Sequence, residues 1–395
     1  MTFQYNFDKI SNRWESDSLK WKVYGEDILP MWVADMDFVS PEPVISALHA
    51  RLDHGIFGYP ESAMDKPMTS SGLRHTIQER MFRLYQWEIE PEDIILIPGV
   101  VTGFNLACHA LVNPEQAVLI QTPVYPPILN AAKETGILKQ EMELTRCDDG
   151  AYAVDWDLFE SCCTPFTRIF ILCNPHNPIG KVFKVEELQH IAQICLQKGV
   201  IICSDEIHCD LVYRGYKHTP IATLDPEVAQ NTITLMAPSK TYNIPGLQCS
   251  FAIIQNPELR KIYLEARKGL VPWVNLLGVV AADAAYQHGQ DWLNQLLIYL
   301  ERNRDYLYQN IQEKFADIEM GLPEATYLAW LDCRKLGISE NPYKFFLKNG
   351  HVALNDGTSF GRGGEGFVRL NFGCPKSLLI DGLERLKTVL SSCRS

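Results

Sequence analysis

The sequence predicts an α/β fold in which a mostly parallel sheet forms the centre of a large domain, accompanied by a smaller α+β domain. Between residues 93 and 254, short apolar runs alternate with stretches of helical periodicity, which is typical of a parallel sheet covered by helices on both faces. After about residue 290 the chain is helix-rich again, and two apolar strands and a last helix follow. A length of 395 residues suits two domains.

The elements are expected in a definite order along the chain. Ser40-Pro41 is a start signal for a helix that runs towards Leu52, and helical spacing from Leu73 to Leu84 predicts a second helix. The predicted strands of the large domain are Asp93 to Ile97, Ala117 to Gln121, Arg168 to Cys173, Val200 to Ser204, Thr232 to Met236, and Ser250 to Ile254. The helix from Val185 to Leu196, closed by Gly199, is one crossover between them.

The remaining segments form the smaller domain. Its predicted elements are a helix with the apolar stripe Leu293, Leu297 and Leu300, strands at Tyr327 to Leu331 and Phe367 to Phe372, and a last helix carrying Leu379, Leu383, Leu386 and Leu390. We place the large domain at residues 48–288. The small domain is expected to combine residues 1–47 with residues 289–395.

Composition excludes several classes of protein. A formal net charge of −12 and the lack of a Lys/Arg block argue against a nucleic-acid partner. The start of the sequence has no leader pattern, and no run of about 18 apolar residues indicates a membrane span, so we expect a cytoplasmic protein without a membrane partner. The twelve cysteines are scattered without a CxxC pair, which indicates reduced core residues.

Four of the predicted strands end next to chemically capable residues. Ligands of an open parallel sheet bind beyond the carboxyl ends of its strands, so these residues are expected to converge. Val100-Val101-Thr102-Gly103 opens a helix whose free amides suit a phosphate. Asn177 lies in a proline-rich turn, Asp205 follows the strand ending at Ser204, and Lys240 follows Pro238-Ser239.

Each of these residues alone has an ordinary interpretation, such as a surface lysine or a glycine turn. Together, a lysine for an imine, a carboxylate for a pyridinium nitrogen and a helix end for a phosphate specify pyridoxal 5′-phosphate. The crowding of Asp205, Glu206, His208 and Asp210 also makes a metal site an alternative interpretation. We expect no metal, because no second His/Cys cluster with ligand spacing accompanies them.

The sequence resembles a known family over almost its whole length. The specific stretches are Trp32 to Phe38, Pro98 to Gly103, Thr122 to Pro127, Asn174 to Pro178, Ser204 to His208, Ala237 to Asn243, and Phe367 to Asn371. The chain is similar to fold-type I pyridoxal-phosphate enzymes, and among them to the MalY/PatB branch of cystathionine β-lyases and cystalysin-like cysteine C–S lyases. This resemblance implies a PLP-dependent transferase-like fold with a seven-stranded sheet.

The resemblance also implies roles for single residues. Lys240 would bind the cofactor and act as the base, Asp205 would pair with its ring nitrogen, and Tyr125 would stack on the ring and take part in catalysis. The other implied cofactor contacts are Asn177 and His208 at the 3′ oxygen, and Val100, Val101, Ser239 and a neighbouring subunit's Tyr59 at the phosphate. Substrate contacts are implied for Arg369, which would bind the α-carboxylate, and for Ala34 and Asn177.

Two positions depart from aspartate aminotransferase-like relatives. His208 stands where those relatives have a tyrosine, and Gln248 stands where they have a phosphate-binding arginine. Phosphate affinity is therefore expected from backbone amides and hydroxyl groups.

The function implied is α,β-elimination from cystathionine or cysteine-type amino acids, which yields a thiol such as homocysteine or sulfide, pyruvate and ammonia. A class I/II aminotransferase is the alternative, because it shares every cofactor contact. A regulatory protein of the MalY type is a second alternative, although no helix-turn-helix or basic appendage supports DNA binding. The implied assembly is a homodimer with active sites at the subunit interface.

Overall fold

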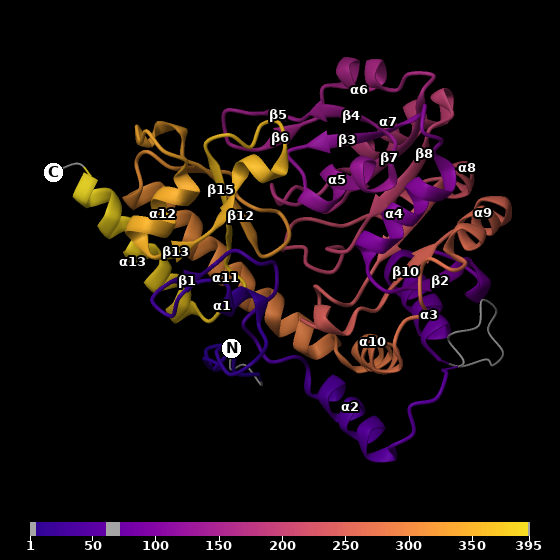
Figure 1. Cartoon of the computed structure of the whole chain (residues 1–395), viewed down its shortest axis with the longest axis horizontal. Coiled ribbons are helices and arrows are strands. Elements are labelled where there is room, and N and C mark those ends of the chain that lie inside the picture. The colour runs from indigo at the N-terminus through magenta and orange to yellow at the C-terminus, as the bar shows by residue number, and fades with distance from the viewer. Residues whose placement is uncertain (1–4, 61–71, 394–395) are drawn as a thin grey trace.

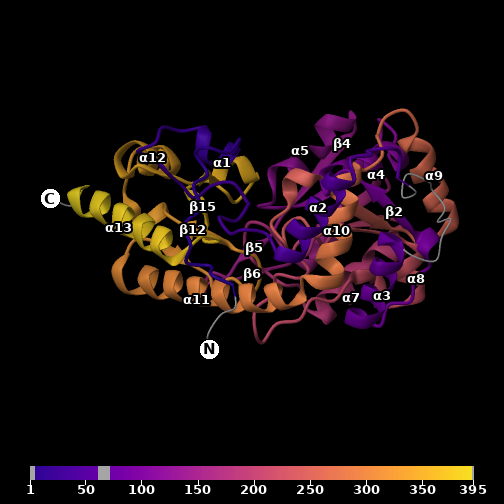
Figure 2. The same ribbon diagram turned by 90° about the horizontal axis from the view of Figure 1, so that it is seen from below.

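The structure is a computed structural model that describes residues 5–60 and 72–393. Two lobes lie side by side (Figures 1 and 2), and the first and last described residues lie in the smaller one. The larger lobe contains a seven-stranded sheet, and the smaller lobe contains a four-stranded antiparallel sheet with the long helix α11 (Gln290–Lys314) packed beside it. The predicted combination of an α/β part and an α+β part is therefore confirmed.

The large sheet has the strand order β2-β10-β9-β8-β7-β3-β4. Its strands are β2 (Ile94–Ile97), β3 (Ala117–Thr122), β4 (Leu138–Glu143), β7 (Thr167–Cys173), β8 (Ile201–Asp205), β9 (Thr232–Met236) and β10 (Ser250–Ile253). Only β10 runs against its neighbours, so the sheet is mostly parallel as predicted. The edge strand β4 was not predicted, because five of its six residues are exposed or half-buried and no apolar run marks it.

Helices cover both faces of this sheet because its strands are apolar on both sides. Along β7, Ile169 and Ile171 pack with α4 (Val100–Leu111), α5 (Pro126–Thr135) and α9 (Pro257–Arg267), whereas Phe170 and Leu172 pack with α6 (Trp156–Cys162) and α7 (Val185–Lys198). Gly103 allows α4 to lie close to the sheet, since a Cβ there would come within 2.6 Å of Ile97 Cδ1.

Helices α2 (Glu42–His54), α3 (Leu73–Tyr85) and α10 (Leu276–His288) pack together at one side of the large lobe (Figure 1). The proposed division at 47/48 falls inside α2, and the division at 288/289 falls at the end of α10. The shorter elements of the large lobe are β5 (Thr145–Arg146), β6 (Tyr152–Ala153) and α8 (Pro226–Gln230).

The small lobe contains the sheet β11-β12-β15-β14 and a two-stranded parallel pair, β1-β13. Its strands are β1 (Leu29–Pro30), β11 (Glu319–Met320), β12 (Leu328–Asp332), β13 (Val352–Ala353), β14 (Asn355–Asp356) and β15 (Phe367–Asn371). Its helices besides α11 are α1 (Leu19–Lys22), α12 (Pro342–Gly350) and α13 (Lys376–Cys393).

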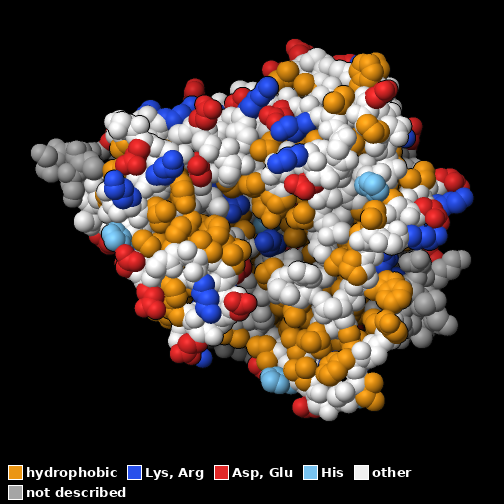
Figure 3. Space-filling view, in the orientation of Figure 1, with side chains coloured by type: hydrophobic (Ala, Val, Ile, Leu, Met, Phe, Trp, Pro, Cys, Tyr) orange, Lys and Arg blue, Asp and Glu red, His pale blue; other side chains and the backbone are white. Residues whose placement is uncertain are grey.

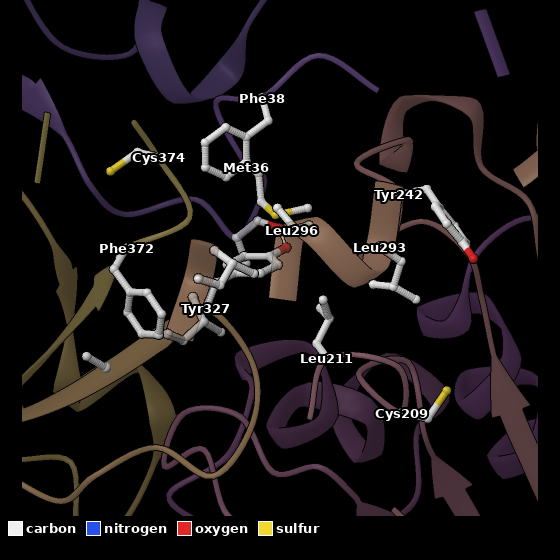
Figure 4. Packing of buried hydrophobic residues seen from close by; sticks show 14 of the residues in the cluster. Met36, Phe38, Cys209, Leu211, Tyr242, Leu293, Leu296, Tyr327, Phe372 and Cys374 are labelled. Carbon is white, nitrogen blue, oxygen red and sulfur yellow. Dashed lines mark hydrogen bonds between the residues drawn. The ribbon is translucent and has the colours of Figure 1, made fainter. Parts of the chain in front are cut away.

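One hydrophobic cluster joins the two lobes. Figure 4 shows Met36 and Phe38, from the segment before α2, pointing into the cluster that also holds Leu296 of α11 and Tyr327. Because this segment contributes to a shared core, its position is coupled to both lobes. Within residues 5–60 and 72–393, no helix is long and apolar enough to cross a bilayer.

Candidate active site

A cavity lies at the carboxyl ends of the parallel strands. Its lining combines Ala34 with residues that end or follow β2, β3, β7, β8 and β9 and with residues before or at the start of β10: Pro98, Gly99, Val100, Val101, Thr102, Tyr125, Cys173, Asn177, Asp205, Ile207, His208, Ser239, Lys240, Pro245, Gln248, Cys249 and Ser250. On the face in Figure 3 the surface is hollowed between the lobes, with basic side chains visible in the hollow. The predicted convergence at the strand ends is therefore observed.

Lys240 is presented by the turn that follows β9. Its Nζ donates a hydrogen bond to the Ala34 carbonyl over 2.6 Å, and the side chain remains partly accessible from the cavity. Burial, reinforced by the positive charge of Arg369, lowers the pKa of the amine to about 8. An amine with this pKa is partly neutral near pH 7 to 8, so it can accept a proton.

Asp205 is the last residue of β8 and is buried. Its Oδ1 accepts a hydrogen bond from the Ile207 amide over 3.1 Å, which is the one donor to this carboxylate among the described residues. Burial raises the pKa of Asp205 to about 7, against the opposing effects of that amide and of Lys240. Among the described residues the carboxylate has no ion-pair partner, so a cationic group of a ligand in the cavity would compensate its charge.

The N-terminus of α4 forms another wall. Gly99, with a φ of 110°, precedes the helix, and its amide donates to Ser250 Oγ over 2.8 Å. Ser250 in turn donates to the Ile97 carbonyl over 2.9 Å, so this turn is fixed to β10. The free amides at Val100 and Val101 and the positive end of the helix dipole favour an anion at this wall.

Tyr125, Asn177 and Arg369 are connected by hydrogen bonds. The Tyr125 amide donates to the Asn177 carbonyl over 3.0 Å, and the Asn177 side-chain oxygen accepts from Arg369 Nη1 over 2.8 Å. Arg369 Nη2 donates to Asn355 Oδ1 over 2.6 Å and to the Trp32 carbonyl over 3.0 Å. Arg369 is buried just behind the cavity lining, which lowers its pKa to about 10.

His208 lines the cavity as a buried, neutral imidazole. Burial, with the nearby charges of Lys240 and Arg369, lowers its pKa to about 3. Its Nδ1 has no hydrogen-bond partner among the described residues. A ligand oxygen or hydroxyl in the cavity would satisfy that nitrogen.

The acidic residues around Asp205 point to different partners and do not converge. Glu206 Oε2 pairs with His218 Nε2 over 2.8 Å, and Asp210 Oδ1 pairs with Arg80 Nη2 over 2.6 Å. Asp210 also accepts from Thr241, directly after Lys240. In the part of the chain that the structure describes, no three His, Cys, Asp or Glu side chains are grouped as metal ligands.

Tyr59 is the one predicted site residue that lies away from the cavity of its own chain. It is 90% exposed, and its ring contacts Trp273 edge-on at 5.5 Å. Sequence reasoning missed Tyr327, whose hydroxyl donates to the Ala34 carbonyl over 2.8 Å, and Ser250. A polar residue at the start of an apolar strand was the available signal for Ser250.

The sequence profile of the aminotransferase class I and II family matches residues 35–386, and the chain belongs to that family. It is 42% identical to cystathionine β-lyase PatB of Bacillus subtilis (strain 168), over 98% of this chain and 100% of the relative. It is 32% identical to protein MalY of Escherichia coli (strain K12), over 99% and 100% of the two chains. The crystal structure of cystalysin from Treponema denticola, which contains pyridoxal 5′-phosphate, superposes with a TM-score of 0.92 at 32% identity and covers 98% and 99% of the two chains.

Proposed function

We propose that this chain is a pyridoxal 5′-phosphate-dependent C–S β-lyase that cleaves cystathionine or cysteine-type amino acids into a thiol, pyruvate and ammonia. The observation that carries the proposal is the meeting of Lys240, Asp205 and the α4 N-terminus in one cavity. Full-length similarity to a cystathionine β-lyase supports the choice of reaction.

The residues present fit this cofactor. The α4 amides at Val100 and Val101 and the Ser239 hydroxyl would hold the phosphate, and Asp205 would pair with the ring nitrogen. Tyr125 would cover one face of the ring, and Asn177 and His208 would contact its 3′ oxygen. Two buried groups have unmet bonding capacity in the described structure: the Asp205 carboxylate has a single donor, and His208 Nδ1 has no partner.

The chemistry divides between the cofactor and the chain. Pyridoxal 5′-phosphate, when bound, supplies an aldehyde that binds amines and a ring that accepts the electron pair left after loss of the Cα proton. Lys240 provides the amine for the aldehyde and, once freed, the base that takes the Cα proton, for which a pKa of about 8 is suitable. Asp205 keeps its partner nitrogen protonated because a buried carboxylate is stabilised by a cation.

Arg369 would bind the substrate α-carboxylate. Its planar guanidinium is held by Asn177, Asn355 and the Trp32 carbonyl, and its Nε has no partner among the described residues. A carboxylate that enters beside it can accept charge-assisted hydrogen bonds. Ala34, on the other side of Lys240, would complete the wall around the α-carbon.

We further propose a homodimer in which Tyr59 reaches the phosphate of the other subunit's site. Tyr59 contacts Trp273, and Ile56, Phe57 and Leu270, which lie within three residues of these two in the sequence, are exposed as well. Exposed apolar side chains of this kind are typical of a surface that a partner covers. Asn275 donates to the Leu247 carbonyl over 2.8 Å, so this surface adjoins the cavity rim near Gln248.

We also propose that the chain forms a large domain at residues 48–288 and a small domain that combines residues 1–47 with residues 289–395. A cytoplasmic location is proposed because the eleven cysteines from Cys108 to Cys374 are all free, which suits a reducing compartment.

The reaction is tested by an assay that compares product formation with and without an amino-group acceptor. Purified protein loaded with pyridoxal 5′-phosphate is incubated with cystathionine or cysteine, with and without a 2-keto acid. Pyruvate and ammonia formed at the same rate in both arms support the lyase. Amino-group transfer that requires the keto acid supports the aminotransferase alternative, and turnover in neither arm contradicts both.

A further inference from the structure

The segment Trp32 to Phe38 contains an unusual row of backbone acceptors. Five consecutive carbonyls, from Trp32 to Met36, each accept a hydrogen bond from a side chain, although the segment lies outside helices and strands. Buried carbonyls normally find partners within regular structure. The path of this segment is therefore set by side chains from elsewhere in the fold.

Each of the five carbonyls has a donor from one of the two places that carry the proposed chemistry. Three of them have a second donor: Tyr327 at Ala34, Lys20 at Asp35 and Arg13 at Met36. Arg369 and Asn371 of β15 bind the Trp32, Val33 and Asp35 carbonyls, with Asn371 Nδ2 at 2.6 and 2.7 Å from the last two. Lys240 and Asn243 of the turn after β9 bind the Ala34 and Met36 carbonyls over 2.6 and 2.8 Å. From Val33 to Met36, donors from the two lobes therefore alternate along this strip, by which we mean residues 32–38.

Asn243 makes further contacts with the strip. Its Oδ1 accepts from the Met36 amide over 2.9 Å, and its Nδ2 also donates to the Phe38 carbonyl over 2.8 Å. Its φ of 56° lies in the left-handed region, which costs a non-glycine residue energy. The amide contacts offset that cost, so the turn after Lys240 is formed together with the strip.

Ion pairs of Asp35 and Asp37 also hold the strip in place. Asp37 accepts from Lys20 Nζ over 2.6 Å and from Arg13 Nη1 over 2.8 Å, and Arg13 Nη2 pairs with Asp35 over 2.8 Å. Met36 and Phe38 are buried in the shared core. The strip therefore behaves as a rigid support and not as a mobile loop between lobes.

We propose that Asn243 and Asn371 are positioning residues that hold Lys240 and Arg369 in register on this common support. The inference rests on the proposed function, because it assigns the base and the carboxylate-binding group to those two residues. Asn243 lies three positions after Lys240, and Asn371 lies two positions after Arg369. Each asparagine fixes its own end of the pair, so the separation of amine and guanidinium is set by the strip between them.

The substitutions that test this proposal remove the amide contacts with the strip, and those at Asn371 also remove the acceptor of the Gly373 amide. Asn243→Gly keeps the positive φ accessible while it removes all three side-chain hydrogen bonds. Asn371→Leu replaces the amide with an apolar group of similar size, and Asn371→Ser is the smaller second variant. The matched control is Asn303→Leu, because Asn303 is as buried as Asn371 and donates to two carbonyls, Phe372 and Cys374, but to none in the strip.

Two measurements are made on each variant. Hydrogen exchange of the cofactor-free protein reports on the amides of residues 32–38, and steady-state kinetics with pyridoxal 5′-phosphate reports kcat and KM separately. We expect Asn371→Leu and Asn371→Ser to raise KM, Asn243→Gly to lower kcat, and both sites to speed exchange in the strip. A misplacement of about 1 Å costs on the order of 100-fold, which sets the scale of the kinetic change.

The control separates positioning from general destabilisation. Asn303→Leu is expected to lower thermal stability as the others do, while strip exchange, kcat and KM stay at wild-type values. Equal kinetic losses in the control, or wild-type exchange and kinetics in the Asn243 and Asn371 variants, would overturn the proposal. Lack of lyase turnover in the wild type refutes the proposed function instead. The exchange data still decide whether Asn243 and Asn371 hold residues 32–38 in place.

Discussion

Arg369 Nη1 donates to Asn177 Oδ1 over 2.8 Å, although 192 positions separate the two residues in the sequence. Asn177 follows β7 of the large sheet and Arg369 lies in β15 of the small lobe, so this hydrogen bond joins the lobes at the cavity. With Asn355 and the Trp32 carbonyl on Nη2, the guanidinium plane is fixed before any ligand enters. Such preorganisation favours a planar, bidentate partner.

Arg369→Lys tests the role of that plane. Lysine keeps the positive charge but loses the fork, so binding of the substrate carboxylate weakens. We expect KM to rise about 10- to 100-fold with a smaller change in kcat, since a hydrogen bond to a charged group contributes about 1.5 to 3 kcal/mol. Arg362→Lys is the control, because the Arg362 side chain is 70% exposed. An unchanged KM would remove Arg369 from substrate binding.

Asp205→Asn is expected to stabilise the cofactor-free protein. The Asp205 carboxyl keeps its proton up to about pH 7 when folded but ionises near pH 4 when unfolded. Between these values the unfolded chain binds fewer protons, so the stability of the wild type falls as pH rises. The variant lacks this penalty and should be more stable by roughly 2 to 4 kcal/mol at pH 8, with no difference near pH 4.

Urea unfolding of the cofactor-free forms between pH 4 and 8 measures this difference, with the exposed Asp148→Asn as control. In the loaded enzyme the same Asp205→Asn change should lower kcat at least ~100-fold, which is the scale of a protonation role. A variant that is both active and unaltered in its pH-dependent stability would show that Asp205 faces no ligand cation.

Lys240→Met removes the proposed attachment point. We expect no lyase turnover and no cofactor fixed to the chain by borohydride, because no other lysine lines the cavity among the described residues. Peptide mass spectrometry locates the reduced cofactor in the wild type, and the exposed Lys217→Met serves as control. Borohydride labelling of another residue in the wild type would refute the assignment.

Mixed dimers test whether the subunits share their sites. Tyr59→Ala in one chain and Lys240→Met in the other leave one site with both native residues, provided that Tyr59 acts across the interface. We expect the homodimer of each single variant to have low activity. The mixed dimer has one intact site of two, so it should recover up to half of the activity of the wild-type dimer. The double variant, with both changes in one chain, should not complement itself, and a monomer in sedimentation analysis would rule out the shared site.

The fold was predictable where local chemistry determines it. Thr232 to Met236 was predicted with the bounds that the structure has, because an apolar β-branched run stops at a proline. Lys240 and Asp205 were placed at one cavity by the rule that parallel strands deliver ligand-binding residues at their carboxyl ends. The edge strand β4 was missed because a strand at a sheet edge needs no continuous apolar run.

Residues that act through distant backbone were not predictable from local patterns. Asn243 and Asn371 lie within stretches that carry the family resemblance, yet nothing in their spacing reveals that both bind the same remote segment. Their contacts depend on the path of residues 32–38, which propensity and periodicity do not determine. The role proposed for Tyr59 likewise depends on contact with another subunit, because its side chain is exposed and lies away from the cavity of its own chain.

The row of carbonyls from Trp32 to Met36 has a practical consequence for protein engineering. A shortened variant that begins at α2 would keep every strand of the seven-stranded sheet, and by domain-boundary criteria it would look intact. It would nevertheless lack Ala34, which lines the cavity and whose carbonyl accepts the hydrogen bond from Lys240. Chimeras between relatives should therefore exchange this early stretch together with the segments that contain residues 240–243 and 369–371, as a single cassette.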